Sequence, residues 1–392
     1  MKTLGSVIKA SVISVLGVLG YNQCFAEESD KARQLSQQQR EQRIEHSAQF
    51  KDGKAILRTP SVSSSESSLA TIRKFFFERA SYKPSETLPH YPTNLRRLEQ
   101  RSKQMRVTWL GHSSLFIDLD NTRILIDPVF DYASPWIAKS LFKRNVNAPL
   151  SRSEVPMPDV IVISHDHYDH LEESTVRYYA DKEVKFFVPL GVGRHLESWG
   201  VEPRKIEEFD WWQDSYINGI KFTSTPANHN SGRTGFDSNS TLWSSWAING
   251  QHGSFFYSGD SAYDDQFRVI GDKLGPFDIA FIEVAANVKN GVGFPVENWG
   301  HMQARHTMQA FIDLNAEQLF PVHWSTYELF AHKWDEPMTD LIAESRLSGA
   351  NLVTPMVGET VDVTEQMKTT FWWQNPQLDV ANVQLNTQKS YY

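Results

Sequence analysis

Residues 160–170 read Val160-Ile161-Val162-Ile163-Ser164-His165-Asp166-His167-Tyr168-Asp169-His170. The β-branched run is typical of a buried strand, and four side chains that can bind a metal follow it. His165 and His167 point the same way, because side chains of an extended chain repeat every second residue. Asp169 and His170, on the following turn, can face a second metal. The pattern predicts a two-metal site held by imidazoles and carboxylates, which Zn(II) accepts when no thiolate is present.

Three further candidates stand at the end of a β-like run or just beyond it. They are His229 after Thr225-Pro226-Ala227-Asn228, Asp260 after Phe255-Phe256-Tyr257-Ser258-Gly259, and His323 after Leu319-Phe320-Pro321-Val322. Taken singly, each is more often a satisfied polar residue at a strand end than a ligand. In the order His, Asp, His after the first cluster, the three together are predicted to complete the two-metal site.

The chain around these residues alternates between strand-like and helix-like patterns. Short β-rich runs with turn signals begin near residue 105, and helical patterns lie between them, notably at 171–179 and 302–314. Strands that alternate with helices indicate an α/β (α+β) chain, and we predict a four-layer αββα sandwich with an N-terminal helical extension. Residues 105–362 form the predicted catalytic domain, and 363–392 a C-terminal tail.

The ordered set of candidate ligands resembles the metal-binding motifs of the metallo-β-lactamase superfamily, over roughly residues 105–362. The resemblance implies one zinc on His165, His167 and His229. It implies a second zinc on Asp169, His170 and His323, with Asp260 bridging the two beside a hydroxide. Asp127, which ends a strand-like run before Pro128, is similar to the structural aspartate of the family's first motif. Iron or manganese in one of the two positions stays open, since His and Asp ligands accept these metals too.

Within the superfamily, the chain resembles the N-acyl-phosphatidylethanolamine-hydrolysing phospholipase D group. The resemblance rests on Trp109-Leu110-Gly111-His112-Ser113, Leu242-Trp243-Ser244-Ser245-Trp246, Gly259-Asp260-Ser261-Ala262-Tyr263, Gly275-Pro276-Phe277-Asp278, His301-Met302 and His323-Trp324-Ser325-Thr326-Tyr327. Two departures border the substrate cleft. Asn230 stands where an aromatic residue commonly follows the histidine of the third motif, and 283–299 differs from the mammalian enzymes. The fold and the metals therefore carry over better than the substrate.

The resemblance also implies catalytic roles for three residues. Asp260 positions the nucleophile and accepts a proton. Asp166 corresponds to an aspartate that contacts the metal-bound water. His301, at the start of a helical pattern, holds the scissile group or protonates the leaving oxygen, with a helix-capping contact as the open alternative. His112 is expected to hydrogen-bond a metal ligand rather than bind metal.

The function implied is a zinc-dependent phosphodiesterase of phospholipase D type, which uses a metal-bridging hydroxide on N-acyl-phosphatidylethanolamine-like lipids. A lactone or carboxylic-ester hydrolase on the same dinuclear site is the alternative. A non-catalytic protein with structural zinc is disfavoured, because such sites are usually four-coordinate and closed. An apolar cleft for a small-molecule or lipid substrate can be lined by several aromatic residues. These are Trp211, Trp212, Trp243, Trp246, Trp299, Trp324 and Phe330, of which Trp243 and Trp246 are better explained as core.

The N-terminal segment and the overall charge bear on location and partners. Lys2 and Lys9, a short apolar run at 10–20 and Cys24-Phe25-Ala26 predict a signal peptide over residues 1–26. The protein is expected in the periplasm or cell envelope of a bacterium, with anchoring through this segment or a lipidated Cys24 as the alternative. Residues 27–104 read as a polar extension and linker, whose first part is either a solvated helix or a disordered tether. A net charge of -8 disfavours a nucleic-acid partner, whereas association with a membrane surface and the oligomeric state stay open.

Overall fold

The computed structural model describes residues 30–59, 82–285, 300–330, 332–363 and 370–374. The predicted signal peptide, Trp299 and most of the C-terminal tail lie outside this part of the chain. Two mixed sheets of seven strands each form the centre of the molecule. The first, in spatial order, contains β16 (Thr360–Asp362), β3 (Arg106–Gly111), β4 (Ser114–Leu119), β5 (Thr122–Ile126), β6 (Val160–Val162), β7 (Lys185–Pro189) and β8 (Ile206–Phe209). The second contains β15 (Asn351–Leu352), β14 (Gln318–Val322), β13 (Ile279–Glu283), β12 (Ser254–Tyr257), β11 (Ser245–Asn249), β10 (Ile220–Thr225) and β9 (Asp214–Ile217).

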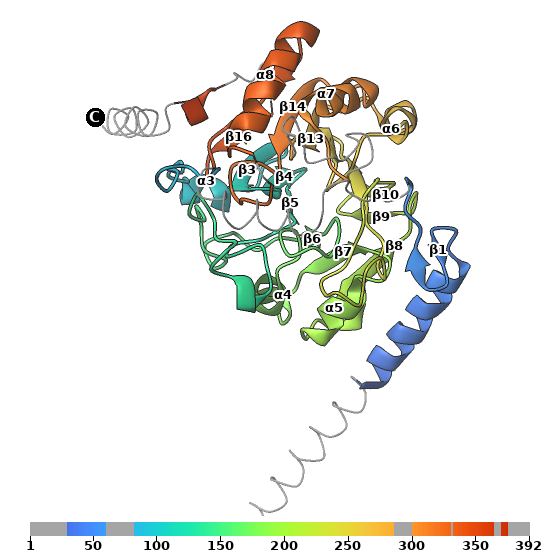
Figure 1. Cartoon of the computed structure of the whole chain (residues 1–392). Coiled ribbons are helices and arrows are strands. Elements are labelled where there is room, and N and C mark those ends of the chain that lie inside the picture. Colours follow the sequence, from blue (N-terminus) through green and yellow to red (C-terminus); the bar gives the residue numbers. More distant parts are fainter. Residues whose placement is uncertain (1–29, 60–81, 286–299, 331, 364–369, 375–392) are drawn as a thin grey trace, which may run out of the picture.

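Helices cover the outer faces of both sheets, which confirms the predicted αββα sandwich (Figure 1). The first sheet carries α4 (Glu173–Tyr179) and α5 (Gly193–Ser198). On the opposite side lie α6 (Gln266–Leu274), α7 (Ala304–Asp313) and α8 (Glu336–Ser348), and a short α3 (Leu95–Glu99) lies near the first strands. Within the described residues, no helix has the length and apolar composition needed to cross a bilayer.

The unbroken apolar runs of the sequence follow from burial of the first sheet on both faces. In β4, Leu115 and Ile117 belong to the core between the sheets, whereas Phe116 belongs to the core under α4 and α5. In β6, Val160 faces the first of these cores and Ile161 the second. Since neighbouring side chains of a strand point to opposite faces, a strand covered on both sides has no polar alternation.

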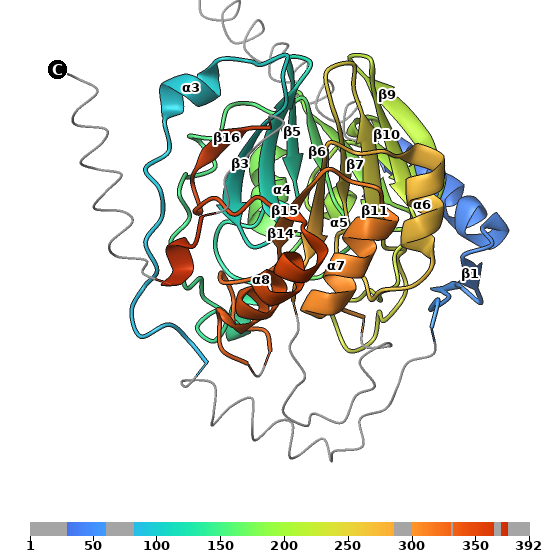
Figure 2. The same cartoon turned by 90° about the horizontal axis from the view of Figure 1, so that it is seen from above.

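The N-terminal extension is helical over residues 30–46 and packs against the β8–β9 edge of the sandwich (Figure 2). Arg40 is buried there, and its guanidinium lies 2.7 Å from a carboxylate oxygen of both Glu197 and Glu208. The hairpin of β1 (Phe50–Lys51) and β2 (Lys54–Ala55) follows. A buried arginine between two carboxylates specifies how the helix docks, so this part of the extension is a packed element and not a tether.

Parallel pairing brings functional loops to one edge of the sandwich. β5 to β8 are parallel neighbours in the first sheet, and β12 to β15 are parallel neighbours in the second. The carboxyl ends of parallel strands meet at the same edge, where loops carry binding residues. The loops that follow β6, β12 and β14 carry residues 164–170, Asp260 and His323.

Candidate metal centre

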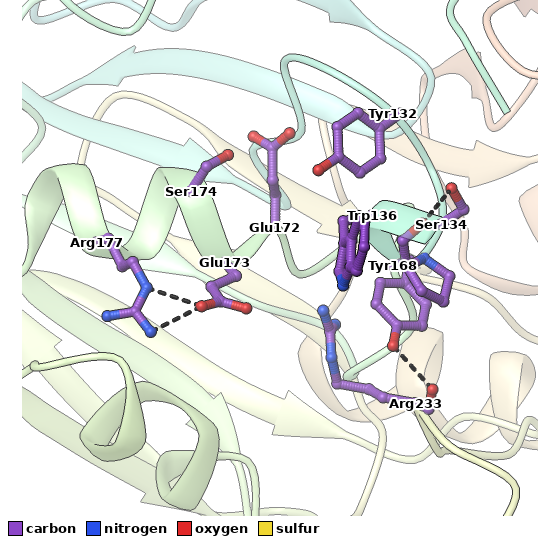
Figure 3. A pocket seen from close by; sticks show the side chains of 10 residues that line it. Tyr132, Ser134, Trp136, Tyr168, Glu172, Glu173, Ser174, Arg177 and Arg233 are labelled. Atoms are coloured by element: carbon purple, nitrogen blue, oxygen red, sulfur yellow. Dashed lines mark hydrogen bonds and ion pairs between the residues drawn. The ribbon is translucent and has the colours of Figure 1, made fainter. Parts of the chain in front are cut away.

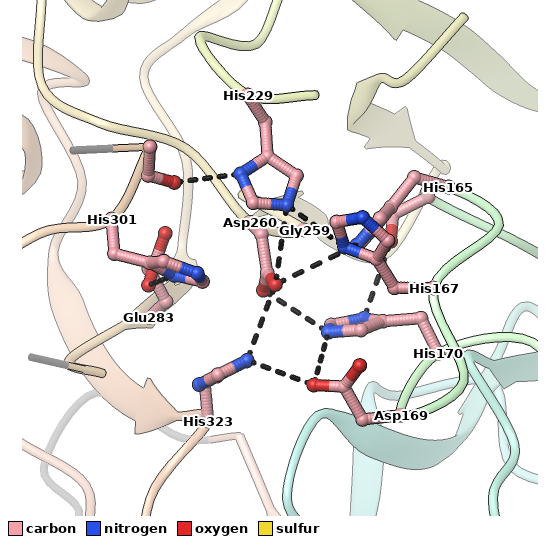
Figure 4. A network of polar contacts seen from close by, with 12 residues as sticks. His165, His167, Asp169, His170, His229, Gly259, Asp260, Glu283, His301 and His323 are labelled. Carbon is pink, nitrogen blue, oxygen red and sulfur yellow. Dashed lines mark hydrogen bonds and ion pairs between the residues drawn. The ribbon is translucent and has the colours of Figure 1, made fainter. Parts of the chain in front are cut away.

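The seven predicted metal ligands come from four loops and lie close together (Figure 4). Besides the loops after β6, β12 and β14, the loop after β10 brings in His229. Five of the seven side chains are buried, whereas those of His167 and Asp169 are partly exposed. Their donor atoms form two groups on either side of the Asp260 carboxylate.

The first group consists of three histidines and Asp260. Nδ1 of His167 lies 2.8 Å from Nε2 of His165 and 3.2 Å from Nε2 of His229. Oδ2 of Asp260 lies 3.6 Å from Nε2 of His165 and 3.7 Å from Nε2 of His229. Four donor atoms thus converge on one point between four side chains.

The second group consists of Asp169, His170, His323 and again Asp260. Oδ2 of Asp169 lies 3.4 Å from Nε2 of His170 and 3.3 Å from Nε2 of His323. The Asp260 carboxylate lies 3.1 Å from Nε2 of His170 through Oδ1, and 3.2 Å from Nε2 of His323 through Oδ2. The Asp260 carboxylate therefore lies between the two groups, and its bridging role stays a prediction.

The spacing of the donor atoms fits a divalent cation in each group. Ligands about 2.1 Å from a tetrahedral metal lie about 3.4 Å from one another, and the distances above range from 2.8 to 3.7 Å. Among the described residues, Nε2 of His170, Nε2 of His323 and Oδ1 of Asp260 are buried without a hydrogen bond. Buried polar atoms are normally satisfied, so these unsatisfied atoms indicate that a cation is their partner.

Electrostatics favour the same interpretation. Burial, with neighbouring histidines adding to it, lowers the pKa of His165 well below its usual value and keeps its imidazole neutral. Burial alone would raise the pKa of Asp260, but His170 and His323 hold it well below the usual range. Burial likewise opposes protonation of His323, yet Asp260 and Asp169 raise its pKa to about 10. The carboxylates thus attract positive charge into the centre, which a bound cation supplies without protons.

Asp127 holds the ligand loop, residues 164–170, through two of its residues. Its Oδ1 accepts a hydrogen bond of 2.7 Å from the backbone N–H of Ser164, and its Oδ2 lies 2.7 Å from Nδ1 of His170. The hydroxyl of Tyr257 donates to the same Oδ2 at 2.5 Å. With Nδ1 held by the carboxylate, His170 presents Nε2 to the centre, as a metal-binding histidine requires.

Gly259 lets the strand end approach the ligand loop closely. Its φ is +54°, and a Cβ at this position would lie 2.6 Å from Cβ of Ser164. Glycine is the residue that tolerates both this left-handed conformation and this approach. The turn it makes aims the next residue, Asp260, between the two groups of ligands.

His112 contacts a predicted ligand, as the sequence led us to expect. Its Nε2 lies 3.0 Å from Oδ2 of Asp169, and its ring packs against that of His323 at 4.1 Å between centroids. Burial, with His323 adding to it, lowers the pKa of His112 to about 3. A neutral imidazole at this distance can hold the Asp169 carboxylate in place.

Asp166 has both carboxylate oxygens engaged by partners other than the predicted ligands. Oδ1 accepts a hydrogen bond of 2.8 Å from the backbone N–H of Gly232, and Oδ2 lies 3.2 Å from Nε2 of His195. Arg233 donates to the backbone oxygen of Asp166 at 2.7 Å. These contacts tie the ligand loop to the loop after His229, and the catalytic role of Asp166 stays a prediction.

His301 forms a pair with Glu283, a residue that the sequence did not single out. Its Nδ1 lies 2.8 Å from Oε2 of Glu283, which is fully buried at the end of β13. Asp260, Glu283, His301 and His323 also converge closely enough to share a cation. The one available signal for Glu283 was its position, a carboxylate closing the apolar strand Ile279–Glu283. α7 begins at Ala304 with Gln303 as its N-cap, so His301 is not the N-cap residue of this helix.

The predicted aromatic cleft is only partly realised. Trp243 and Trp246 are core residues, as expected, and Trp324 is also buried, with its ring stacked on that of Trp109. Phe330 packs against the rings of His301 and His323, with centroids 5.0 and 6.1 Å apart. Phe330 therefore borders the metal centre.

Known proteins with similar sequences include hydrolases. Residues 122–324 match the beta-lactamase superfamily domain. The chain is 34% identical over 296 residues to an uncharacterized protein of Mycobacterium tuberculosis, covering 74% of this chain and 77% of the relative. It is 30% identical over 274 residues to N-acyl-phosphatidylethanolamine-hydrolyzing phospholipase D 1 of Caenorhabditis elegans, covering 66% of this chain and 76% of the relative.

Solved structures support the fold. Isothiocyanate hydrolase from Delia radicum gut bacteria matches with a TM-score of 0.50 and 16% identity, over 66% of this chain and 98% of that one. CmlA, a diiron beta-hydroxylase from Streptomyces venezuelae, matches with a TM-score of 0.50 and 17% identity, over 67% of this chain and 55% of its own. The sandwich fold of these structures and the histidines and aspartates that converge at its edge in this chain agree with the sequence relatives. The family match and the sequence relatives show that this chain belongs to the metallo-β-lactamase superfamily and is a metal-dependent hydrolase.

Proposed function

We propose that the protein is a zinc-dependent phosphodiesterase that cleaves N-acyl-phosphatidylethanolamine-like lipids on the phospholipase D side of the phosphate. The observation that carries the proposal is the 30% identity to an N-acyl-phosphatidylethanolamine-hydrolyzing phospholipase D, over 76% of that relative. Imidazole and carboxylate donors at tetrahedral spacing favour zinc for both groups. The charged and apolar N-terminal segment leads us to propose export to the periplasm or cell envelope as well.

The seven candidate ligands would hold two cations with Asp260 between them. When bound there, two such cations would supply a hydroxide nucleophile near neutral pH and would stabilise negative charge on a phosphoryl oxygen. The residues of the chain have complementary tasks. Asp260 orients the attacking water and takes up its proton, and His112 and Asp127 hold Asp169 and His170 in place.

His301 serves the leaving group in this proposal. Its Nδ1 is held by Glu283, so proton transfer to the leaving oxygen runs through Nε2. Its ring lies 5.0 Å from that of His229 and 5.2 Å from that of His323, between centroids, and so borders both groups of ligands. In the reaction, the oxygen of water joins phosphorus. The bond from phosphorus to the ethanolamine oxygen breaks, and that oxygen takes the proton.

The test is hydrolysis of N-acyl-phosphatidylethanolamine by purified zinc-loaded protein in water enriched in oxygen-18. The expected products are N-acylethanolamine and phosphatidic acid, with the label in the phosphatidic acid. Diacylglycerol as the product, or turnover of a lactone and ester panel without turnover of the lipid, would contradict the proposal. Asp260→Asn should be inactive. His252→Asn is the matched control, because His252 pairs with Asp120 at the β11–β12 turn, away from the ligand loops.

A further inference from the structure

Three large apolar side chains extend into solvent from two loops. Trp136 and Ile137 are 75% and 78% exposed in a 3₁₀ turn (Trp136–Ala138), and Phe236 is 98% exposed in the loop after His229. Single exposed apolar residues are ordinary on protein surfaces. Three large apolar side chains on neighbouring loops indicate a surface that binds a partner.

Both loops border one cavity of about 280 Å³ (Figure 3). Trp136 lines the cavity from the first loop and Arg233 from the second. Tyr168 also lines it, and the Arg233 guanidinium lies over its ring at 4.0 Å. Tyr168 stands between the predicted ligands His167 and Asp169. Trp136 therefore lines an opening beside the ligand loop, with Ile137 next to it in the chain and Phe236 three residues after Arg233.

Basic residues are interleaved with the apolar ones. Lys139 and Lys143 follow Trp136 on the same segment, both are exposed, and neither forms an ion pair with another residue that the structure describes. The carboxylates of the cavity are already compensated, because Glu172 and Glu173 lie 2.7 Å from guanidinium nitrogens of Arg152 and Arg177. The surface is therefore apolar and basic.

We propose that Trp136, Ile137 and Phe236 insert into the interfacial region of a phospholipid bilayer while Lys139 and Lys143 contact anionic headgroups. Aromatic and aliphatic tips flanked by lysines are typical of proteins that lie on a membrane surface, where the ring reaches the acyl boundary and the cation stays at the phosphates. The inference rests on the proposed function for its choice of lipid as partner. Docking in this orientation holds the ligand loop next to the bilayer that contains the substrate.

Binding to vesicles tests the docking surface without any need for activity. The full zinc-loaded protein is sedimented with phosphatidylcholine vesicles that either contain or lack phosphatidylglycerol. We expect wild-type protein to bind. The double variant Trp136→Ser/Ile137→Ser and the single variant Phe236→Ser should each bind about 10-fold less tightly or worse. Lys139→Gln/Lys143→Gln should bind phosphatidylcholine vesicles as wild type does, but should lose the increase in affinity that phosphatidylglycerol gives.

The matched control is Leu347→Ser, since Leu347 is 84% exposed on α8, on the other side of the sandwich. It should bind vesicles as wild type does. Equal binding by wild type and all variants, or absence of wild-type binding, would overturn the proposal. So would a wild-type dimer that dissociates in the Phe236→Ser variant, because the surface would then serve a second copy of the chain.

Hydrolysis separates this proposal from the proposed function. With N-acyl-phosphatidylethanolamine in vesicles and dispersed in detergent, the ratio of the two rates should fall in the Trp136 and Phe236 variants. Normal vesicle binding without hydrolysis would contradict the proposed lipid substrate and leave the docking surface supported. Hydrolysis in detergent with no vesicle binding would support the proposed lipid substrate and contradict the docking surface.

Discussion

Glu283 and His301 form a pair beside the metal centre, with Oε2 of the glutamate 2.8 Å from Nδ1 of the histidine. The other oxygen, Oε1, accepts a hydrogen bond of 2.5 Å from the backbone N–H of Ser261, the residue after Asp260. The glutamate thus links His301 to the backbone that positions the predicted bridging ligand. This geometry favours a fixed orientation of the His301 ring at the centre, as proton transfer requires.

Replacing His301 should affect turnover more than metal content. We expect His301→Ala and His301→Asn to lower kcat by ~10²-fold or more with little change in bound metal, because neither side chain transfers a proton at neutral pH. Glu283→Gln should lower kcat by a smaller factor and change KM little, since an amide can still accept from Nδ1. Steady-state kinetics and metal analysis measure both effects. Normal kcat in His301→Asn would contradict a catalytic role.

Metal content tests the two groups of ligands directly. Purified protein should contain about two zinc ions per chain, and His165→Ala with His167→Ala should lose at least one. Asp260→Asn should keep its circular dichroism spectrum but lose most activity, because its carboxylate lies within 3.2 Å of Nε2 of His323 and near both groups. Less than half an equivalent of metal in carefully prepared wild-type protein would be incompatible with a dinuclear centre.

Asp127 should act on metal affinity through His170. Asp127→Asn weakens the contact to Nδ1 of His170, and we expect a loss of 10- to 100-fold in affinity for one metal, roughly the range for such supporting carboxylates. Tyr257→Phe removes only the hydroxyl that donates to Asp127 and should have a smaller effect. Titration against a zinc-buffering chelator measures these affinities. Unchanged affinity in Asp127→Asn would show that the loop holds His170 without it.

Asp118 should make stability depend on pH. Burial raises the pKa of this carboxyl to about 6, although Arg123 opposes the shift, whereas an unfolded aspartate titrates near ~3.9. The folded state binds the proton more tightly, so stability from this group is present at low pH and declines as pH rises from about 4 to 6. At about pH 7.5, the free energy of unfolding of Asp118→Asn should exceed that of wild type by up to about 3 kcal/mol, as measured by urea denaturation. At about pH 4 the two proteins should differ little. Equal midpoints at both pH values would contradict this.

Export should leave a defined N-terminus. Cleavage after Ala26 predicts that the mature chain begins at Glu27 without an acyl group. Intact-protein mass spectrometry of the fractionated bacterial envelope gives the answer. A chain that begins with an acylated Cys24 would instead identify a lipoprotein.

The sequence by itself determined the layers of the sandwich and the candidate ligands. Val160–Val162 is apolar at every position because the sheet is covered on both faces, and that pattern is visible without coordinates. His165 to His170 lie within one loop, so their proximity follows from spacing alone. His229, Asp260 and His323 were found because each follows a strand-like run, and loops at strand ends carry functional residues.

Only the tertiary structure decided which residues hold the candidate ligands and the packed elements in place. Tyr257 reaches Asp127 across 130 residues of chain, and neither residue type nor spacing indicates that contact. Glu283 reads as one more strand-end residue until His301 is placed against it. Arg40 looks like part of a solvated helix until Glu197 and Glu208 enclose it. Such contacts depend on how separate elements pack, and burial between elements is a property of the assembled fold rather than of any local pattern.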